Sequence, residues 1–272
     1  SQIGGPDGFY FGDLSIAIIG ETIITRRFNI LGAASIGLLN GFDALKLASD
    51  SIIPHVRTDI VKYLKQSTDY HITRLQANYF SNPTKDIYTK ISAGIFEPMF
   101  LGYGGEVLYK PFERNYGIGV ELWQVHQREY KQMFGLKDDK YNTLTGHVSL
   151  YYREPTSRVL LHVKGGKYLA KDSGFTFTAS RDFRSGLNMG VFFSLTDISK
   201  AEFGEGSFDK GFFFSLPIQV FFDKYSRGQS GFGLRPLTRD GAQSLVHAQT
   251  LWSTTYQANK DQMIHEWDSF YD

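Results

Sequence analysis

Polar and apolar side chains alternate one by one along residues 146–164. His147, Ser149 and Tyr151 form a polar series, Val148 and Leu150 between them are apolar, and the alternation resumes after a turn-like stretch of four residues. Because successive side chains of a β-strand point to opposite faces, this period of two predicts strands with one apolar and one polar face.

The same period recurs along the whole chain, in about thirteen segments of about 9 to 13 residues, which suits strands that cross a bilayer at a tilt. No alternation of helix and strand patterns appears, which argues against a parallel α/β sheet. Since single-chain bacterial barrels usually have an even number of strands, we expect 12 or 14. The segments begin near residues 8, 25, 70, 86, 101, 115, 141, 157, 172, 184, 209, 228 and 244.

Two all-β architectures contain strands with one apolar and one polar face. In a soluble sandwich the apolar face is the interior, whereas in a membrane barrel it faces lipid and the polar face lines the lumen. Strands of soluble proteins usually hold about five or six residues, and short turns alternate with longer loops in outer-membrane barrels, as they do here. The pattern therefore favours an antiparallel transmembrane β-barrel of 12 to 14 strands over residues 1–258.

Two regions interrupt the period of two. In residues 39–69, Pro54 can start a short helix, because apolar residues such as Val56 and Ile60 follow it at helical spacing. This predicts a long, partly helical outer loop that can tuck into the lumen. Residues 259–272 lack the alternation but contain spaced apolar side chains, which predicts a short helical C-terminal tail.

The composition excludes several classes of function. The 272 residues carry a net charge of +1, so no nucleic-acid partner is expected. The chain has no cysteine, which excludes disulfides and thiol chemistry. No nucleotide-binding loop and no apolar run of about 18 residues occurs, so we expect no cofactor and no membrane helix. The N-terminus lacks a signal-peptide pattern, which indicates a mature chain or a part of a longer one.

The polar face of the predicted wall carries charges of both signs. Arginine can form forked hydrogen bonds with sugar hydroxyls or carboxylates, and Tyr151 or Trp123 can stack on a sugar ring. A network of mutually neutralised charges that holds the barrel round would use the same residues. The candidates for lining the lumen and contacting a polysaccharide are Arg74, Lys90, Glu106, Glu121, Trp123, His147, Tyr151, Arg153, Arg158, His162, Lys164 and Arg235.

His147 and Ser149 also raise a hydrolase hypothesis, because some outer-membrane barrels are lipases or proteases. Two positions apart on one strand face, their Cβ atoms are about 6.5 to 7 Å apart, too far for a direct nucleophile–base hydrogen bond unless both side chains lean together. No G-x-S-x-G elbow occurs, and the acidic residues near position 200 do not match a calcium loop. We therefore expect no enzymatic activity and no metal.

Several stretches of the sequence resemble one known family. They are GGEVLYKPFERNYGIGVEL, TGHVSLYY, AEFGEGSFDKGF and FGLRPLTRDGAQSL, and PHVRTDIVKYL also fits. They are similar to the YjbH family of exopolysaccharide-associated outer-membrane proteins, which includes proteins of capsule and O-antigen capsule gene clusters. The resemblance runs from about residue 50 onward. Because family members are considerably longer, this chain resembles their C-terminal half.

The resemblance implies a β-barrel of the bacterial outer membrane that takes part in secretion of an exopolysaccharide or capsule polysaccharide, as a passive conduit or translocation component. It implies contacts with polysaccharide, with the lipid bilayer or lipopolysaccharide, and with periplasmic and inner-membrane export components. It supplies no catalytic residues. Two alternatives stay open: an outer-membrane hydrolase of lipase or protease type, and a plugged structural barrel that acts as an assembly scaffold.

Overall fold

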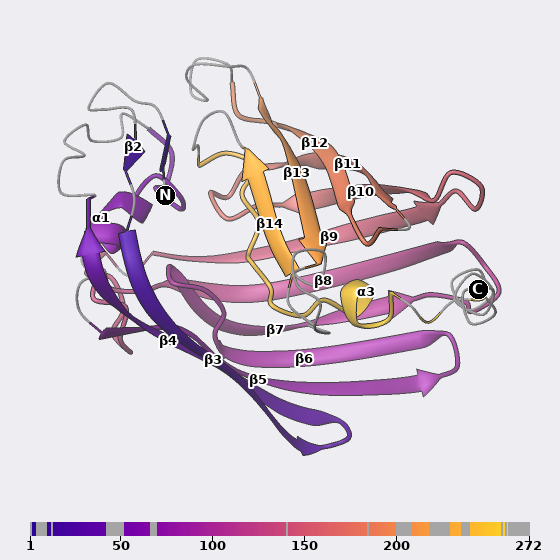
Figure 1. Ribbon diagram of the computed structural model, residues 1–272, viewed down its shortest axis with the longest axis horizontal. Helices are drawn as coiled ribbons and strands as arrows, with labels where there is room; N and C mark the ends of the chain where they lie inside the picture. Colours follow the sequence, from indigo (N-terminus) through magenta and orange to yellow (C-terminus); the bar gives the residue numbers. More distant parts are fainter. Residues whose placement is uncertain are drawn as a thin grey trace.

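Twelve strands form one antiparallel sheet in which each strand is hydrogen-bonded to its neighbours in sequence (Figure 1). The computed structural model describes residues 2–3, 10–11, 13–41, 52–65, 70–139, 141–183, 185–199, 208–217, 229–234, 240–256, 258 and 260. The strands of this sheet are β3 (Asp13–Thr25), β4 (Phe28–Asn40), β5 (Tyr70–Thr84), β6 (Ile87–Ile95), β7 (Phe100–Tyr109), β8 (Tyr116–Gln127), β9 (Asn142–Arg153), β10 (Val159–Lys167), β11 (Ser173–Asp182), β12 (Asn188–Thr196), β13 (Asp209–Pro217) and β14 (Gln229–Leu234). A separate pair consists of β1 (Gln2–Ile3) and β2 (Tyr10–Phe11). The predicted all-β antiparallel fold is confirmed, with 12 strands in the sheet.

The sheet curls but is open along one side. Its order begins at β14 and ends at β3, and in the described part of the chain no register joins these two strands. The predicted closure into a barrel is therefore not seen. β14 has six residues against 13 in β3, so it offers only a short edge for such a pairing.

One predicted strand is wrong. The segment expected to begin near residue 244 adds no strand, because residues 242–250 run without helix or strand and lead into helix α3 (Leu251–Thr254). Thr250 caps this helix by accepting a hydrogen bond from the Ser253 N–H at 3.1 Å. One side of this segment lies on the inner face of the sheet, with Leu245 7% exposed, whereas Val246 on its other side is 51% exposed.

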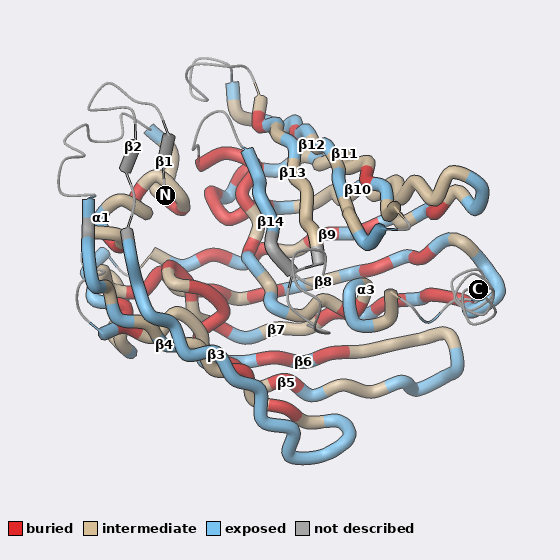
Figure 2. The backbone as a smooth tube through the Cα atoms, viewed as in Figure 1, coloured by how far each residue is buried: buried red, intermediate tan, exposed pale blue. Residues whose placement is uncertain are grey.

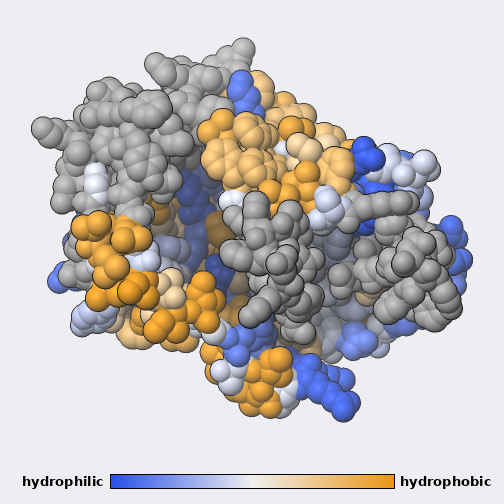
Figure 3. Space-filling view, in the orientation of Figure 1, coloured by the Kyte–Doolittle hydropathy of each residue, from blue (hydrophilic) through white to orange (hydrophobic). Residues whose placement is uncertain are grey.

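The apolar side chains of the strands point outward and the polar ones inward. Val120 and Leu150 are 50% and 52% exposed, whereas His147 and Ser149 are 4% and 7% exposed. Figure 2 shows buried residues on β6 and β8, and Figure 3 shows apolar residues gathered over β3 and β4 and over β12 and β13. This polarity is the reverse of that of a soluble sandwich.

Two segments lie on the concave side of the sheet: the described part of the predicted loop, residues 52–65, and the segment that contains Leu245. Helix α1 (Ile60–Lys65) falls in the predicted loop, although it begins at Ile60 and not at Pro54. Val56 and Tyr63 from this region share a buried apolar cluster with Leu245. The tail predicted at residues 259–272 lies, except for residue 260, outside the described residues. Among the described helices, none has the length and apolar character needed to cross a membrane.

Candidate functional site

One segment, residues 240–256, crosses the polar inner face of the sheet, and we call it the strap (Figure 1). Hydrogen bonds join it to side chains of β6, β7 and β10, and its His247 lies 3.6 Å from Glu121 of β8. Because buried polar groups are costly without partners, the additional hydrogen bonds from the strap stabilise the polar residues of the wall.

The start of the strap is fixed by Asp240. Its carboxylate accepts hydrogen bonds from the N–H groups of Arg57 and Thr58 at 2.7 and 2.9 Å, and from the Thr58 hydroxyl at 2.7 Å. The Arg57 guanidinium donates to the Ser244 carbonyl at 2.7 Å and to both oxygens of Glu97, at 2.7 and 3.2 Å. Hydrogen bonds to a buried carboxylate are among the stronger ones in proteins, so this anchor ties the strap to the segment before α1.

A second anchor comes from the turn between β10 and β11. The Ala242 N–H donates to Asp172 Oδ2 at 2.7 Å, and the Leu169 N–H donates to the Gln243 carbonyl at 2.8 Å. Burial raises the pKa of Asp172, although the hydrogen bond from Ala242 lowers it. The first residues of the strap are thus held from two sides.

The middle of the strap lies on a buried ion pair. Lys90 Nζ is 2.9 Å from Glu106 Oε2, and the Lys90 side chain has 0% of its area exposed. Lys90 also donates to the Gln249 carbonyl at 2.6 Å, and the Leu251 N–H lies 3.0 Å from both Glu106 oxygens. Each charged group therefore has one partner on the wall and one on the strap, which offsets the cost of burying both charges.

The end of the strap is held by stacked rings. Trp252 stacks on Tyr151 with ring centroids 4.0 Å apart, and Tyr151 stacks on His162 at 4.3 Å. Gly117 leaves room for the indole, since a Cβ there would lie 2.8 Å from the Trp252 ring. Both faces of the Tyr151 ring are covered, so the predicted stacking of this ring on a sugar has no free face in this conformation.

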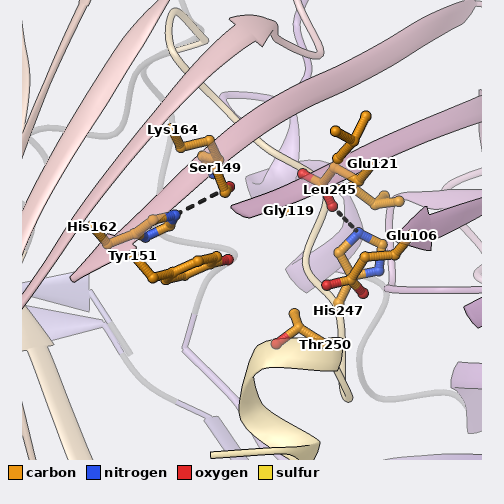
Figure 4. Close-up of a pocket in the computed structure, with 11 residues that line it drawn as sticks. Glu106, Gly119, Glu121, Ser149, Tyr151, His162, Lys164, Leu245, His247 and Thr250 are labelled. Atoms are coloured by element: carbon orange, nitrogen blue, oxygen red, sulfur yellow. Dashed lines mark hydrogen bonds and ion pairs between the residues drawn. The ribbon is translucent and has the colours of Figure 1, made fainter. Parts of the chain in front are cut away.

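A polar cavity of about 140 Å³ lies beside the strap (Figure 4). The Glu121 carboxylate forms a charged part of the cavity wall, and its Oε1 is 2.8 Å from His147 Nδ1. Its Oε2 accepts a hydrogen bond from the Trp123 indole at 3.1 Å and lies 3.6 Å from His247 Nε2. Burial lowers the pKa of His247 to about 4, against the attraction of Glu121, so this ring is neutral at pH 7. Trp123 is 1% exposed and packs 4.5 Å from the His247 ring, so it is not open to a sugar either.

A second cavity, of about 280 Å³, shares Lys164 and Leu245 with the first. Lys164 Nζ donates to Ser244 Oγ at 2.7 Å, so a bond between wall and strap lies at the boundary of the two cavities. The polar residues around the larger cavity are Arg57, Lys164, Thr176, Ser194, Asp209, Gln243 and Ser244.

The structure gathers most of the predicted lumen residues around the strap and the smaller cavity. These are Lys90, Glu106, Glu121, Trp123, His147, Tyr151, His162 and Lys164. Arg153 lies at the end of the strap, 4.1 Å from the Tyr256 ring, and Arg74 is half-buried on β5. Arg158 lies in the turn before β10 with a φ of 60° and is not on a strand, and Arg235 is outside the described residues.

The predicted separation of His147 and Ser149 is reflected in their different partners. Ser149 Oγ is 3.2 Å from His162 Nε2, on the neighbouring strand, whereas His147 contacts Glu121. The strap residues Ser244, His247 and Trp252 are missed by sequence reasoning, because the pattern from residue 244 predicts a wall strand. The signal that could have found them is the turn pair Asp240-Gly241.

Fold and site together define an all-β protein whose antiparallel sheet is apolar outside and whose polar interior is crossed by a strap. The chain belongs to the YjbH family, whose model, described as "Exopolysaccharide biosynthesis protein YbjH", matches residues 1–257. It is 33% identical over 259 residues to "Uncharacterized lipoprotein YjbH" of Escherichia coli (strain K12). The predicted family is thus confirmed, and the match extends well before residue 50.

The alignment with the Escherichia coli protein covers 93% of this chain and 37% of that relative. The chain therefore spans little more than a third of the relative, less than the half that the resemblance implied. The family description names exopolysaccharide biosynthesis and no chemical reaction.

Proposed function

We propose that the chain forms the wall and the internal plug of a bacterial outer-membrane β-barrel that takes part in export of an exopolysaccharide or capsule polysaccharide. The observation that carries this proposal is the reversed polarity of the sheet, with Leu150 exposed outside and Lys90 buried inside. Such an outer face is stable in hydrocarbon. Strands of 9 to 15 residues from β3 to β13 also suit a tilted path across a bilayer.

In a bilayer the free edges of β3 and β14 need hydrogen-bond partners, because no water is present to satisfy them. We propose that these edges pair with each other in the membrane and close the wall. The outer face then contacts lipid and lipopolysaccharide. Passage of the polymer is passive, and energy comes from its synthesis or from inner-membrane components reached through periplasmic partners.

Gel migration in SDS tests the closed wall. The chain purified in detergent should migrate faster before boiling than after it, because a closed barrel without edges keeps its hydrogen bonds in SDS until it is heated. The same migration with and without heating would count against closure. A chain that stays monodisperse with no detergent or lipid would refute the membrane location itself.

The strap favours a plugged form of this barrel. We expect Asp240→Ala to release its start, because the change leaves two backbone N–H groups without their acceptor, at about 1 to 3 kcal/mol each. A cysteine introduced by Ser244→Cys then reports the accessibility of the strap to a thiol reagent, since the chain has no other cysteine. Maleimide labelling of this cysteine should be faster with Asp240→Ala, and the conductance in planar bilayers should be higher than that of the wild type.

Asp240→Asn is the matched control, because it keeps one oxygen acceptor at the same place. It should label at an intermediate rate. Equal labelling and equal conductance in all three proteins would contradict the role of Asp240 as the anchor of a plug. We propose no enzymatic step at Ser149, because its neighbour His162 is stacked on Tyr151 and the family description names no reaction.

A further inference from the structure

The two cavities along the strap together have room for a sugar ring with its substituents. An engineered cavity of about 150 Å³ accommodates a benzene-sized ring. The smaller cavity, of about 140 Å³, is therefore near the size of a bare six-membered ring, and the larger is about 280 Å³. A pyranose with its hydroxyl groups is larger than benzene, so it fits the larger cavity or extends across both. Because both share Lys164 and Leu245, they are adjacent compartments between the strap and the wall.

The polar groups of the smaller cavity have hydrogen-bonding capacity that the protein does not use. The His247 side chain is 6% exposed, and neither of its ring nitrogens has a hydrogen-bond partner among the described residues. His147 Nε2, next to the cavity, is also buried without a partner among them. In a neutral imidazole one nitrogen donates and the other accepts. A ligand that satisfies such a ring must offer both an acceptor and a donor.

A sugar hydroxyl both donates and accepts, and several of them surround one pyranose ring. Carboxylate oxygens of Glu106 and Glu121, the Ser149 hydroxyl and the Lys164 ammonium line the same cavity (Figure 4). This mixture of donors and acceptors suits a polyol and would be costly around an apolar molecule.

The charges around the cavities favour a neutral ligand. Glu106 and Arg57 already have ionic partners at 2.9 and 2.7 Å. Glu121 and Lys164 carry opposite charges on the same small cavity. A carboxylate placed beside Glu106 and Glu121 would be repelled, so an acidic sugar is disfavoured there.

We propose that the two cavities form a binding site for neutral hexose or N-acetylhexosamine residues of a saccharide, with Glu121 and His247 at one end and Lys164 at the centre. The site rests on the proposed function and gives it a substrate class. The strap and the wall each contribute half of the site, so a saccharide bound there contacts the plug directly.

Tryptophan fluorescence of the full chain tests this site, because Trp123 touches His247 and Trp252 covers the Tyr151 ring. Trp267→Phe removes the remaining tryptophan, which lies outside the described residues. The detergent must carry no sugar headgroup. The probes are the methyl β-glycosides of glucose, galactose and N-acetylglucosamine, titrated at millimolar concentration. We expect at least one of them to change the tryptophan emission saturably. Methyl β-glucuronide should bind at least about tenfold more weakly than that glycoside.

His247→Leu and Glu121→Gln should each weaken binding of that glycoside by about tenfold or more, whereas His126→Leu, on the outer face of β8, should not. Heat-dependent migration in SDS shows whether each variant is folded. If His247→Leu does not fold, Glu121→Gln still tests the site, because glutamine keeps the shape of the glutamate side chain. No saturable change with any neutral glycoside, unchanged affinity in both variants, or preferred binding of the glucuronide would overturn the proposal. A closed barrel that binds none of the probes refutes only the site, whereas a chain that binds them but stays soluble without detergent refutes the membrane role.

Discussion

Lys90→Met is expected to lower the free energy of unfolding by about 3 to 5 kcal/mol, because it breaks a buried ion pair by removing one partner. The substitution keeps most of the side-chain length but removes the ammonium from a side chain with 0% exposed area. Glu106 is then left as a buried carboxylate whose ionic partner at 2.9 Å is gone, and the Gln249 carbonyl loses its donor. Urea unfolding in detergent micelles, followed by tryptophan emission, measures the loss.

The double variant Lys90→Met, Glu106→Gln separates the charge from the packing. Glutamine keeps an oxygen that can accept from the Leu251 N–H, and it carries no charge. We therefore expect the double variant to be more stable than Lys90→Met alone. If it is less stable than the single variant, the destabilisation of Lys90→Met does not come from an unpaired Glu106.

Leu150→Arg should cost about 2 to 4 kcal/mol if Leu150 lies near the middle of the bilayer, because a guanidinium on the lipid face of a barrel must leave water for hydrocarbon. Leu150 is 52% exposed, on the same side of the sheet as Val148 and Val120. The free energy of unfolding from lipid vesicles is the quantity to compare with the wild type. A difference near zero would mean that this face does not meet hydrocarbon.

Thr156→Arg is the matched control for this substitution. Thr156 is exposed in the turn between β9 and β10, outside the strands and close in sequence. An arginine there stays in water, so the free energy of unfolding should change by less than about 0.5 kcal/mol. Equal costs at the two positions would point to a general effect of added charge.

The strand pattern could be predicted from the sequence because each strand has one apolar and one polar face. The alternation in β8 and β9 identified the strands and the residues on each face, such as Glu121 inside and Leu150 outside. Family membership was also visible in short stretches of sequence. The expected strand count of 12 or 14 included the observed 12.

The strap could not be predicted from alternation, since an extended segment with one side on the wall and the other exposed is read in the same way as a wall strand. His247 and Gln249 contact Glu121 and Lys90 across more than a hundred residues of sequence, and no local pattern records such contacts. Nor could the pattern reveal that the Tyr151 ring is covered on both sides, because Trp252 comes from the strap. The open edges of β3 and β14 are likewise a property of the whole sheet.

The position of the strap late in the sequence has a consequence for the order of biogenesis. Residue pairs such as Thr58 and Asp240, or Glu106 and Leu251, are separated by 182 and 145 positions. Contacts between such distant positions form slowly, because a long loop must first close. The charged lining of the earlier strands therefore stays hydrated until residues 240–256 have been delivered, because its partners Gln249 and Leu251 belong to that segment.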